Sequence, residues 1–252
     1  MSARTAESSD VERMLDLAEA KRDLYRDNAH PFQRPANDAR TLQRPFVEGL
    51  LARGDFIVLV HEDASTHVDG FLIGRVGPAP PPIGADGDPF HVDDFAVDRP
   101  DLWLSAGDAL LREAARLAHA AGARKAVIVA GGQRVDPPKR AFLRGLSLAL
   151  AAEWWARQLA ARGELPDQDG FEAVVGPAPP VYDPGGPVCL AARLDGPDAL
   201  PRLERYGAAA GAVLAIVPLA TGREDVRTVL VARGYSLASE WYAAPIETLA
   251  AK

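Results

Sequence analysis

The sequence predicts an α/β protein whose helices pack on one mixed, α+β type of sheet, followed by a shorter second copy of part of the same fold. Three observations support this prediction. The stretch Phe90–Ala130 has the pattern strand, turn, helix, strand, and the two apolar segments before it have the pattern of a hairpin. Three motifs of the first 160 residues then return in the same order after residue 170.

Composition excludes several classes of protein. The 252 residues are 48% hydrophobic and 25% charged, which is typical of a globular protein. A net charge of −7 argues against nucleic acid as a partner, because a phosphate backbone requires a basic face. The single Cys189 cannot form an internal disulfide, and no apolar run or leader-like start indicates a membrane or secreted protein. We therefore expect a cytoplasmic protein with no membrane partner.

The first 53 residues predict two helices. Residues Ala3–Ala6 are either a frayed end or a short strand, and the helices cover Asp10–Asp27 and Ala36–Arg53. Pro45 predicts a break or kink in the second helix. The residues expected to face inward are Val11, Met14, Leu15, Leu17, Ala18 and Leu24 in the first helix and Leu42, Phe46, Leu50 and Leu51 in the second.

The next segments predict the centre of the sheet. Strands Phe56–Val60 and Gly70–Val76 form a hairpin, and the loop Gly77–Pro89 is too rich in Pro and Gly to be regular. The strand Phe90–Val97 follows this loop.

A long helix comes next. Ser105 is its expected N-cap, with Asp108 completing a capping box, and Gly122 ends it in the left-handed conformation. The short run Ala126–Ala130 is typical of a strand that is buried on both faces.

The remainder of the chain predicts a helix over Pro137–Gly145, a strand over Leu148–Leu159 and a polar linker over Arg162–Gly170. The recurring motifs then place residues 1–161 in a first domain, 162–170 in the linker and 171–252 in a partial second copy. The matches pair Val76–Pro81 with Val175–Pro180, Ala120–Val129 with Ala209–Pro218, and Glu153-Trp154-Trp155 with Glu240-Trp241-Tyr242.

This order of elements resembles the GNAT N-acetyltransferase fold. In that family a strand ends in Val and is followed by Arg/Gln-x-x-Gly-x-Gly/Ala and a helix that often begins Ala-Leu-Leu. Val97 and Ala109-Leu110-Leu111 match those positions, which places the signature on residues 102–107. Gly107 agrees with it, whereas Ser105 replaces the first Gly and Leu102 replaces the Arg or Gln.

The resemblance implies that acetyl-CoA or another acyl-CoA is a co-substrate. The backbone of the strand would hold its pantetheine arm, and amides of the loop and helix start would hold its pyrophosphate. Asp108 opposes this, since an acid in the first turn stabilises an empty helix and repels a phosphate. Two interpretations stay open: a divergent CoA loop, or a capped helix that binds nothing. The implied cofactor-binding residues are Phe95, Ala96, Val97, Leu102, Trp103, Leu104, Ser105, Ala106, Gly107 and Asp108.

Candidate chemistry comes from the strand before the loop. The family uses a base here, and Asp93 and Asp94 are the candidates. Strand alternation places Asp93 on the face of Phe95 and Val97, and Asp94 on the face of Val92 and Ala96, so that only one carboxylate faces a cleft. The Tyr that serves as general acid in the family has no counterpart in the helix Pro137–Gly145. No residue spacing predicts a metal site.

Two functions follow from these residues. The first is an N-acetyltransferase that moves an acetyl or other acyl group from acyl-CoA directly to a small amine. The alternative is a GNAT-fold binding or scaffold protein that has lost catalysis. A small-molecule amine is the expected partner, a homodimer is left open, and the second copy is expected to bind no cofactor, because Pro197 removes an amide from its loop.

Overall fold

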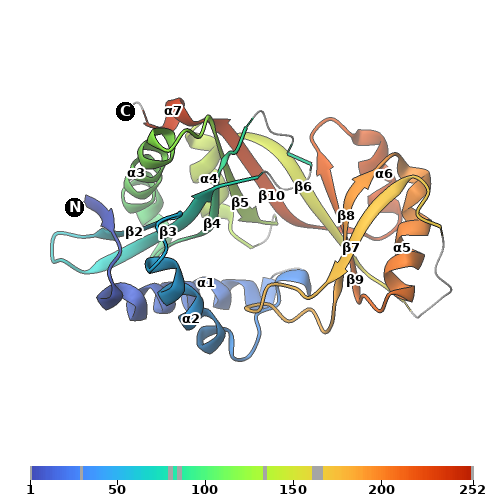
Figure 1. The fold of residues 1–252 in the computed structure, drawn as a ribbon, viewed down its shortest axis with the longest axis horizontal. Helices are drawn as coiled ribbons and strands as arrows, with labels where there is room; N and C mark the ends of the chain where they lie inside the picture. The colour runs from blue at the N-terminus through green and yellow to red at the C-terminus, as the bar shows by residue number, and fades with distance from the viewer. Residues whose placement is uncertain are drawn as a thin grey trace.

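A computed structural model describes residues 2–28, 31–78, 82–83, 87–132, 135–160 and 167–250. Most of these residues belong to strands and helices, which alternate along much of the chain (Figure 1). The strands are β1 (Ser2–Thr5), β2 (Phe56–Glu62), β3 (Val68–Val76), β4 (Phe90–Val97), β5 (Lys125–Gly131), β6 (Ala149–Gln158), β7 (Phe171–Gly176), β8 (Val188–Leu194), β9 (Leu214–Ala220) and β10 (Ser236–Pro245).

Seven α-helices and four short 3₁₀ helices connect these strands in the described part of the chain. The α-helices are α1 (Val11–Asn28), α2 (Ala39–Leu51), α3 (Ala106–Ala120), α4 (Pro137–Gly145), α5 (Leu200–Ala209), α6 (Glu224–Ala232) and α7 (Ile246–Ala250). The 3₁₀ helices are η1 (Ser8–Asp10), η2 (Pro31–Gln33), η3 (Pro100–Leu104) and η4 (Pro197–Ala199). None of the described helices is long and apolar enough to cross a membrane.

The ten described strands form one sheet in the order β1-β2-β3-β4-β5-β10-β6-β9-β8-β7. This order is symmetric about the central β10–β6 pair: β5 corresponds to β9, β4 to β8 and β3 to β7. The last strand of each copy is therefore exchanged, since β10 pairs with β5 of the first copy and β6 pairs with β9 of the second. The two predicted domains consequently share a continuous sheet.

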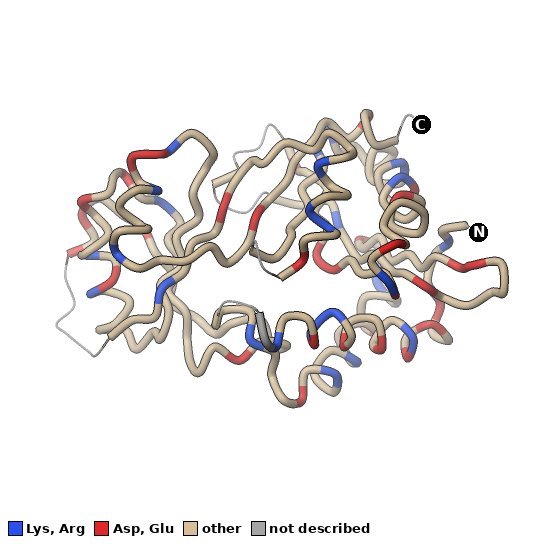
Figure 2. The backbone as a smooth tube through the Cα atoms, turned by 180° about the vertical axis from the view of Figure 1, so that it is seen from behind, with Lys and Arg blue, Asp and Glu red and all other residues tan. Residues whose placement is uncertain are grey.

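Helices cover both faces of the first half (Figure 1). On one face, α3 and α4 pack against β4 and β5, with Phe90, Phe95, Leu110 and Phe142 in a common core. On the other face, α1 and α2 pack against β2 and β3. In the second half, α5 and α6 cover β8 and β9. Acidic and basic residues are interspersed along α1 and α3 (Figure 2).

The predicted repeat is confirmed at the centre of the sheet. Glu153 and Glu240, which are equivalent in the two copies, face each other in the β6–β10 register. Trp154 and Trp241, one residue further on, have ring centroids 4.9 Å apart. Repeated residues therefore lie around one pseudo-twofold axis.

Two buried ion pairs obey the same symmetry. Arg140 of α4 donates to Glu240 at 3.1 Å, and Arg227 of α6 donates to Glu153 at 2.8 Å. Each pair joins one copy to the other, because α4 and β10 come from different copies, as do α6 and β6. These two equivalent ion pairs thus stabilise the exchange of β6 and β10 between the copies.

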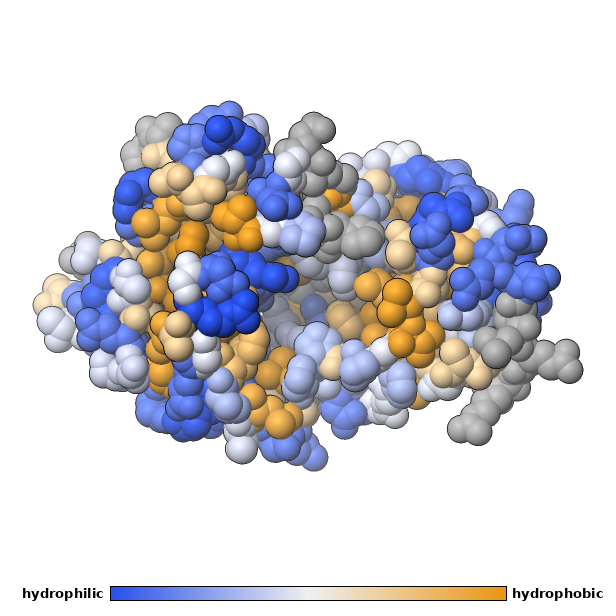
Figure 3. Space-filling model, in the orientation of Figure 1, coloured by the Kyte–Doolittle hydropathy of each residue, from blue (hydrophilic) through white to orange (hydrophobic). Residues whose placement is uncertain are grey.

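Most predicted elements are confirmed, but the buried stripe of α2 is wrong. Leu42 and Phe46 are 39% and 55% exposed, whereas Gln43 and Val47 are buried. The helix also continues through Pro45 without a break. Gln43 takes an inward position because its amide has buried charged partners, described below. Figure 3 shows apolar residues among hydrophilic ones over this face of the molecule.

Two further expectations change, and one is confirmed. Leu24 is 56% exposed rather than inward-facing, because it borders a cavity. Ser105 occupies the N-cap position of α3 but makes no side-chain cap, so the predicted capping box is wrong. Its hydroxyl instead donates to the Leu102 carbonyl at 3.4 Å, while Asp108 pairs with Arg112. Gly122 has φ +98°, as a helix-ending glycine requires.

Two expected irregular segments are only partly described. Residues 79–81 and 84–86 of the loop Gly77–Pro89 and residues 161–166 around the linker lie outside the described residues. The division of the chain at residues 161 and 170 therefore stays a prediction.

Candidate functional site

A cavity opens where β4 and β5 separate. Their parallel pairing runs only from Phe90 opposite Ala126 to Val92 opposite Ile128. Beyond this point the strands diverge, and a cavity of about 450 Å³ lies beside β4. Its lining residues come from α1, from the end of β4 with the following loop, and from the start of α4: Ala20, Lys21, Leu24, Phe95, Ala96, Val97, Asp98, Pro100, Trp103, Val135, Asp136, Pro137 and Pro138.

A β-bulge in β4 overturns the predicted alternation of side chains. Ile73 of β3 is opposite Asp94, but Gly74 is opposite Val92, so Asp93 is the extra residue. Val92 and Phe95 consequently lie in the same core beneath α3, three residues apart. The expectation that Val92 shares a face with Asp94 is therefore wrong, because a bulge shifts the period of two by one residue.

Asp94 is held in a polar network between the sheet and the first two helices. Lys21 of α1 forms an ion pair with one carboxylate oxygen, and the Gln43 amide donates to the other at 3.1 Å. Arg22, itself 2% exposed, donates to the Gln43 oxygen. Burial alone would raise the pKa of Asp94, but the charge and hydrogen bond of Lys21 outweigh it and lower that pKa. Asp94 is thus an ionised, structural carboxylate and a weak base.

Asp93 lies in a different environment. Its side chain is 40% exposed, and its nearest cation is Arg75, with 3.8 Å between Nε and the carboxylate. Partial burial raises its pKa to about 6, and the nearby Asp94 adds to this effect. A carboxylate with this pKa is still ionised at neutral pH and is a better proton acceptor than Asp94.

The loop before α3 forms the 3₁₀ helix η3, which uses some of the predicted phosphate donors. The amide of Leu102 donates to the Arg99 carbonyl at 3.0 Å, and that of Ser105 donates to the Leu102 carbonyl at 3.2 Å. Trp103 is buried against Gly107, where a Cβ would lie 2.8 Å from its ring. Gly107 is therefore required by the packing of Trp103, whatever binds at this helix end.

Two charges flank the same helix end. Asp108 forms an i,i+4 ion pair with Arg112 at 2.6 Å, which offsets the negative charge that opposes a phosphate. Arg99 is the nearest cation in the loop and contacts Asp101 at 3.4 Å. Leu104, another predicted contact residue, is 80% exposed, and Ala106 is fully buried.

Lys139 of α4 enters the site from the side opposite to α1. Only 4% of the residue is exposed, and its Nζ donates to the Phe95 carbonyl at 3.4 Å. The same atom lies 5.3 Å from the ring centre of Phe95 and 5.7 Å from that of Trp103. A buried cation thus reaches the strand that lines the cavity.

The second copy contacts the elements that form this site. Tyr182 pairs with Pro35 in an isolated antiparallel bridge, and its ring lies 6.3 Å from that of Phe32, between centroids. Its hydroxyl is close enough to Lys21 and Asp94 for their charges to affect its pKa, which burial raises. The surface is hollowed between the two halves (Figure 3). A residue of the second copy is therefore part of the polar surroundings of Asp94.

Sequence reasoning missed Lys21, Gln43, Lys139 and Tyr182. Gln43 had a detectable signal, because it is spaced four residues from both Ala39 and Val47 on one helical stripe. Lys139 and Tyr182 had none, since their positions depend on long-range packing. Among the described residues, no group of three or more His, Cys, Asp and Glu is arranged to hold a metal ion.

The second copy has its own, smaller cavity. β8 and β9 are parallel from Val188 opposite Leu214 to Leu190 opposite Ile216, and they diverge at the same step as β4 and β5. The cavity beyond them is about 200 Å³, and Ala191, Ala192 and Val226 are among its lining residues.

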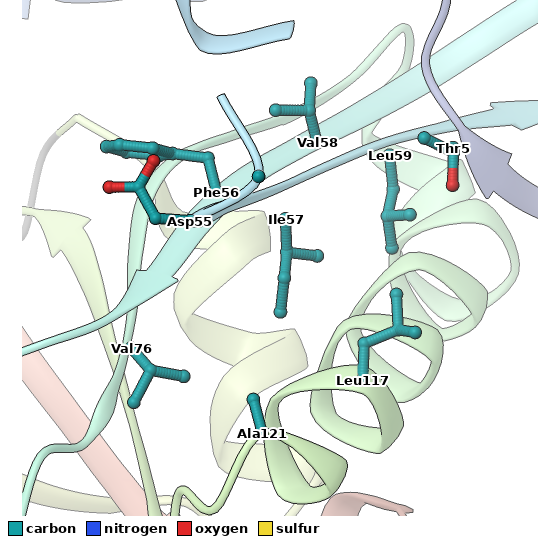
Figure 4. Close-up of a pocket in the computed structure, with 10 residues that line it drawn as sticks. Thr5, Asp55, Phe56, Ile57, Val58, Leu59, Val76, Leu117 and Ala121 are labelled. Carbon is teal, nitrogen blue, oxygen red and sulfur yellow. The ribbon is translucent and has the colours of Figure 1, made fainter. Parts of the chain in front are cut away.

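A third cavity, of about 460 Å³, lies between β2 and α3, away from these strand ends (Figure 4). Apolar side chains of Ile57, Leu59, Val76 and Leu117 point into it, and Asp55 lies at its edge. None of the predicted site residues lines it. It takes no part in the site described above.

Comparison with solved structures agrees with the tandem arrangement. No protein-family model and no curated protein sequence matches the chain. A tandem GNAT protein from the clavulanic acid biosynthesis pathway is similar over 97% of this chain and 98% of its own, with 13% identity and a TM-score of 0.53. An aminoglycoside 6′-N-acetyltransferase from Acinetobacter haemolyticus is similar over 66% of this chain and 100% of its own, with 12% identity and a TM-score of 0.48. The chain has the tandem GNAT fold.

Proposed function

We propose that the protein is an N-acyltransferase that transfers an acyl group, acetyl in the simplest case, from acyl-CoA directly to a small amine. The observation that carries this proposal is the cavity of about 450 Å³ at the divergence of β4 and β5. It is lined by Phe95, Ala96 and Val97, the residues to which the GNAT resemblance assigns the pantetheine arm. A strand whose partner has diverged has backbone groups available to an extended ligand.

The pyrophosphate would lie at the start of α3. Amides of the first helical turn lack partners within the helix and attract anions. The ion pair of Asp108 with Arg112 reduces the repulsion that Asp108 alone would exert. The amides of residues 102–105 are less suitable donors, because the i→i+3 hydrogen bonds of η3 (Pro100–Leu104) already use them. Ala106, Gly107 and Asp108, in the first turn of α3, are the amides that we assign to the phosphates.

Asp93 is the proposed base. Acyl-CoA supplies the thioester, and the amine must lose a proton as it attacks. Asp93 has the raised pKa of about 6 and a partly exposed side chain, whereas Asp94 is neutralised by Lys21. Ionised Asp93 would accept the proton directly or through one water.

A binding or scaffold protein is the second candidate. The observation that favours it is the packing of Trp103 on Gly107, together with the loop amides that donate within η3. These contacts stabilise the loop without any ligand. Loss of activity with retention of the cavity would produce this arrangement.

One experiment separates the two candidates. Acetyl-CoA is titrated into the protein by calorimetry, and release of the CoA thiol is followed over a panel of small amines. The enzyme predicts binding and acceptor-dependent thiol release. Binding with no release over the panel supports the scaffold, and no binding at millimolar acetyl-CoA contradicts the acyltransferase.

A further inference from the structure

Lys139 is a buried cation without a matching anion. Among the described residues, no carboxylate forms a salt bridge with its Nζ, which donates to the Phe95 carbonyl at 3.4 Å. The rings of Phe95 and Trp103 favour a positive charge at this point. Burial of an unpaired charge is nevertheless costly, so the fold alone does not account for a lysine here.

The second copy shows what the fold requires at the same position. Lys139 is the third residue of α4, and Val226 is the third residue of α6. The next residues in each helix, Arg140 and Arg227, make the symmetric ion pairs, which fixes this correspondence. Val226 is 1% exposed and lines the smaller cavity. An apolar side chain therefore satisfies the packing, and the lysine is specific to the copy with the larger cavity.

Three charged groups act on Lys139 from the elements around it. Asp136, at the start of its own helix, and Asp94 of β4 favour its charged form, and Lys21 of α1 opposes it. Burial is the largest influence and lowers the pKa of Lys139 to about 8. The amine can therefore release and regain a proton near neutral pH, which the arginines around it cannot do.

The position of Lys139 relates it to the cavity. The Phe95 carbonyl belongs to the segment that would hold the pantetheine arm, so the ammonium lies one hydrogen bond away from the residue that lines the cavity. The thiol is the terminal group of that arm. A ligand bound along Phe95, Ala96 and Val97 would thus bring its sulfur toward the Phe95 carbonyl, which the ammonium contacts.

We propose that Lys139 Nζ contacts the sulfur of bound CoA and gives its proton to the thiolate when the acyl group leaves. This inference rests on the proposed function, because it requires CoA in the cavity. The bond between the acyl carbon and sulfur breaks, its electron pair stays on sulfur, and one proton moves from the ammonium to sulfur. Lys139 is then neutral and regains a proton from solvent.

The test measures the ionisation of bound CoA itself, so it needs no acceptor. Free CoA is bound to the wild type and to Lys139→Val, Lys139→Arg and Lys125→Met, and the ultraviolet absorbance of the thiolate is followed against pH. Lys139→Val copies the residue of the second half and is expected to fold. Lys125 is the control, since it lies at the opposite, paired end of β5.

A nearby cation lowers the pKa of an acid by about 1–3 units. The thiol of CoA bound to the wild type, to Lys139→Arg and to Lys125→Met should therefore ionise at least about one pH unit below that of CoA bound to Lys139→Val. An unchanged thiol pKa in Lys139→Val that still binds CoA would overturn the role of Lys139 and leave the proposed function intact. Failure of every variant and the wild type to bind CoA would overturn both. Acylation of Lys139 by acyl-CoA, detected by mass spectrometry, would also contradict a proton donor.

Discussion

The two halves repeat one arrangement of strands but differ in the volume of the cavity and in the side chains around it. In each, a pair of parallel strands diverges after three residues and leaves a cavity, but the first cavity is about 450 Å³ and the second about 200 Å³. In the first half, β4 carries Asp93 and Asp94 next to the cavity-lining Phe95, and α4 carries Lys139 next to the cavity-lining Pro138. Ala191, Ala192 and Val226 take the corresponding places in the second.

This difference separates what the fold needs from what a ligand needs. Both halves keep the divergence, a bulge close to it and the helix that follows, because these belong to packing. The charges of Asp94 and Lys139 have no counterpart at the equivalent positions of the second half, so packing alone does not require them. We therefore propose that the first cavity is the functional one. Four predictions test this comparison of the two halves.

The largest expected effect concerns the ion pairs that hold the halves together. Glu240 and Arg140 have 3% and 14% of their side chains exposed, and Glu153 and Arg227 have 10% and 32%. Removal of one partner from a buried pair costs about 3–5 kcal/mol. Glu240→Ala should lower the free energy of unfolding by about 3 kcal/mol, measured with urea, and Glu153→Ala by less. Equal losses would contradict the difference in burial.

A second pair of variants fills one cavity at a time. Val97→Trp should fill the first cavity and weaken acetyl-CoA binding by at least about 100-fold, because a bulky ring replaces the ligand. Leu194→Trp, in the lining of the second cavity, is the matched control and should leave the affinity unchanged. Isothermal calorimetry gives both values. A loss of binding in Leu194→Trp alone would reverse the assignment of the two cavities.

The third prediction concerns pH. Asp93 must be ionised to accept a proton, so turnover should rise as pH increases through about 6. Lys139 must be protonated to donate one, so turnover should fall again as pH increases through about 8. Asp93→Asn should lower kcat by about 100-fold and abolish this rise. Asp101→Asn is the control, because Asp101 lies in η3 after β4 and its side chain is 69% exposed. A pH profile that is unchanged in Asp93→Asn would assign the base elsewhere.

The smallest effect is expected at the helix end. Asp108→Ser removes an acid from the first turn of α3 and should tighten acetyl-CoA binding by about 2- to 5-fold, in line with a helix-end charge effect of about 0.3–1 kcal/mol. Asp198→Ser removes an acid from η4, just before α5 in the second half, and should have no effect on affinity. Weaker binding in Asp108→Ser would mean that Asp108 acts mainly by orienting Arg112.

Much of the fold was predictable from periodicity and from the repeat. Phe90–Val97 and Pro137–Gly145 match their observed bounds, and the repeated Glu-Trp pair marks the pseudo-twofold axis. The exchange of β6 and β10 was not predictable, because local sequence does not specify which copy a strand joins. The buried stripe of α2 was missed for a related reason: the partners of Gln43 lie on other elements.

The candidate site was predictable in position but not in detail. The resemblance located Phe95–Val97, which line the cavity. The bulge at Asp93 has no signature in the sequence, and it decides which carboxylate is neutralised by Lys21. Lys139 reaches Phe95 across 44 residues of sequence, a contact that only the packed structure reveals.

The stoichiometry of acetyl-CoA binding tests the central claim most directly. A calorimetric titration of the full chain should give one site per chain, and Val97→Trp should lose it while Leu194→Trp keeps it. Two sites per chain, or no site at all, would contradict the conclusion that the first of two repeated cavities alone has kept its ligand.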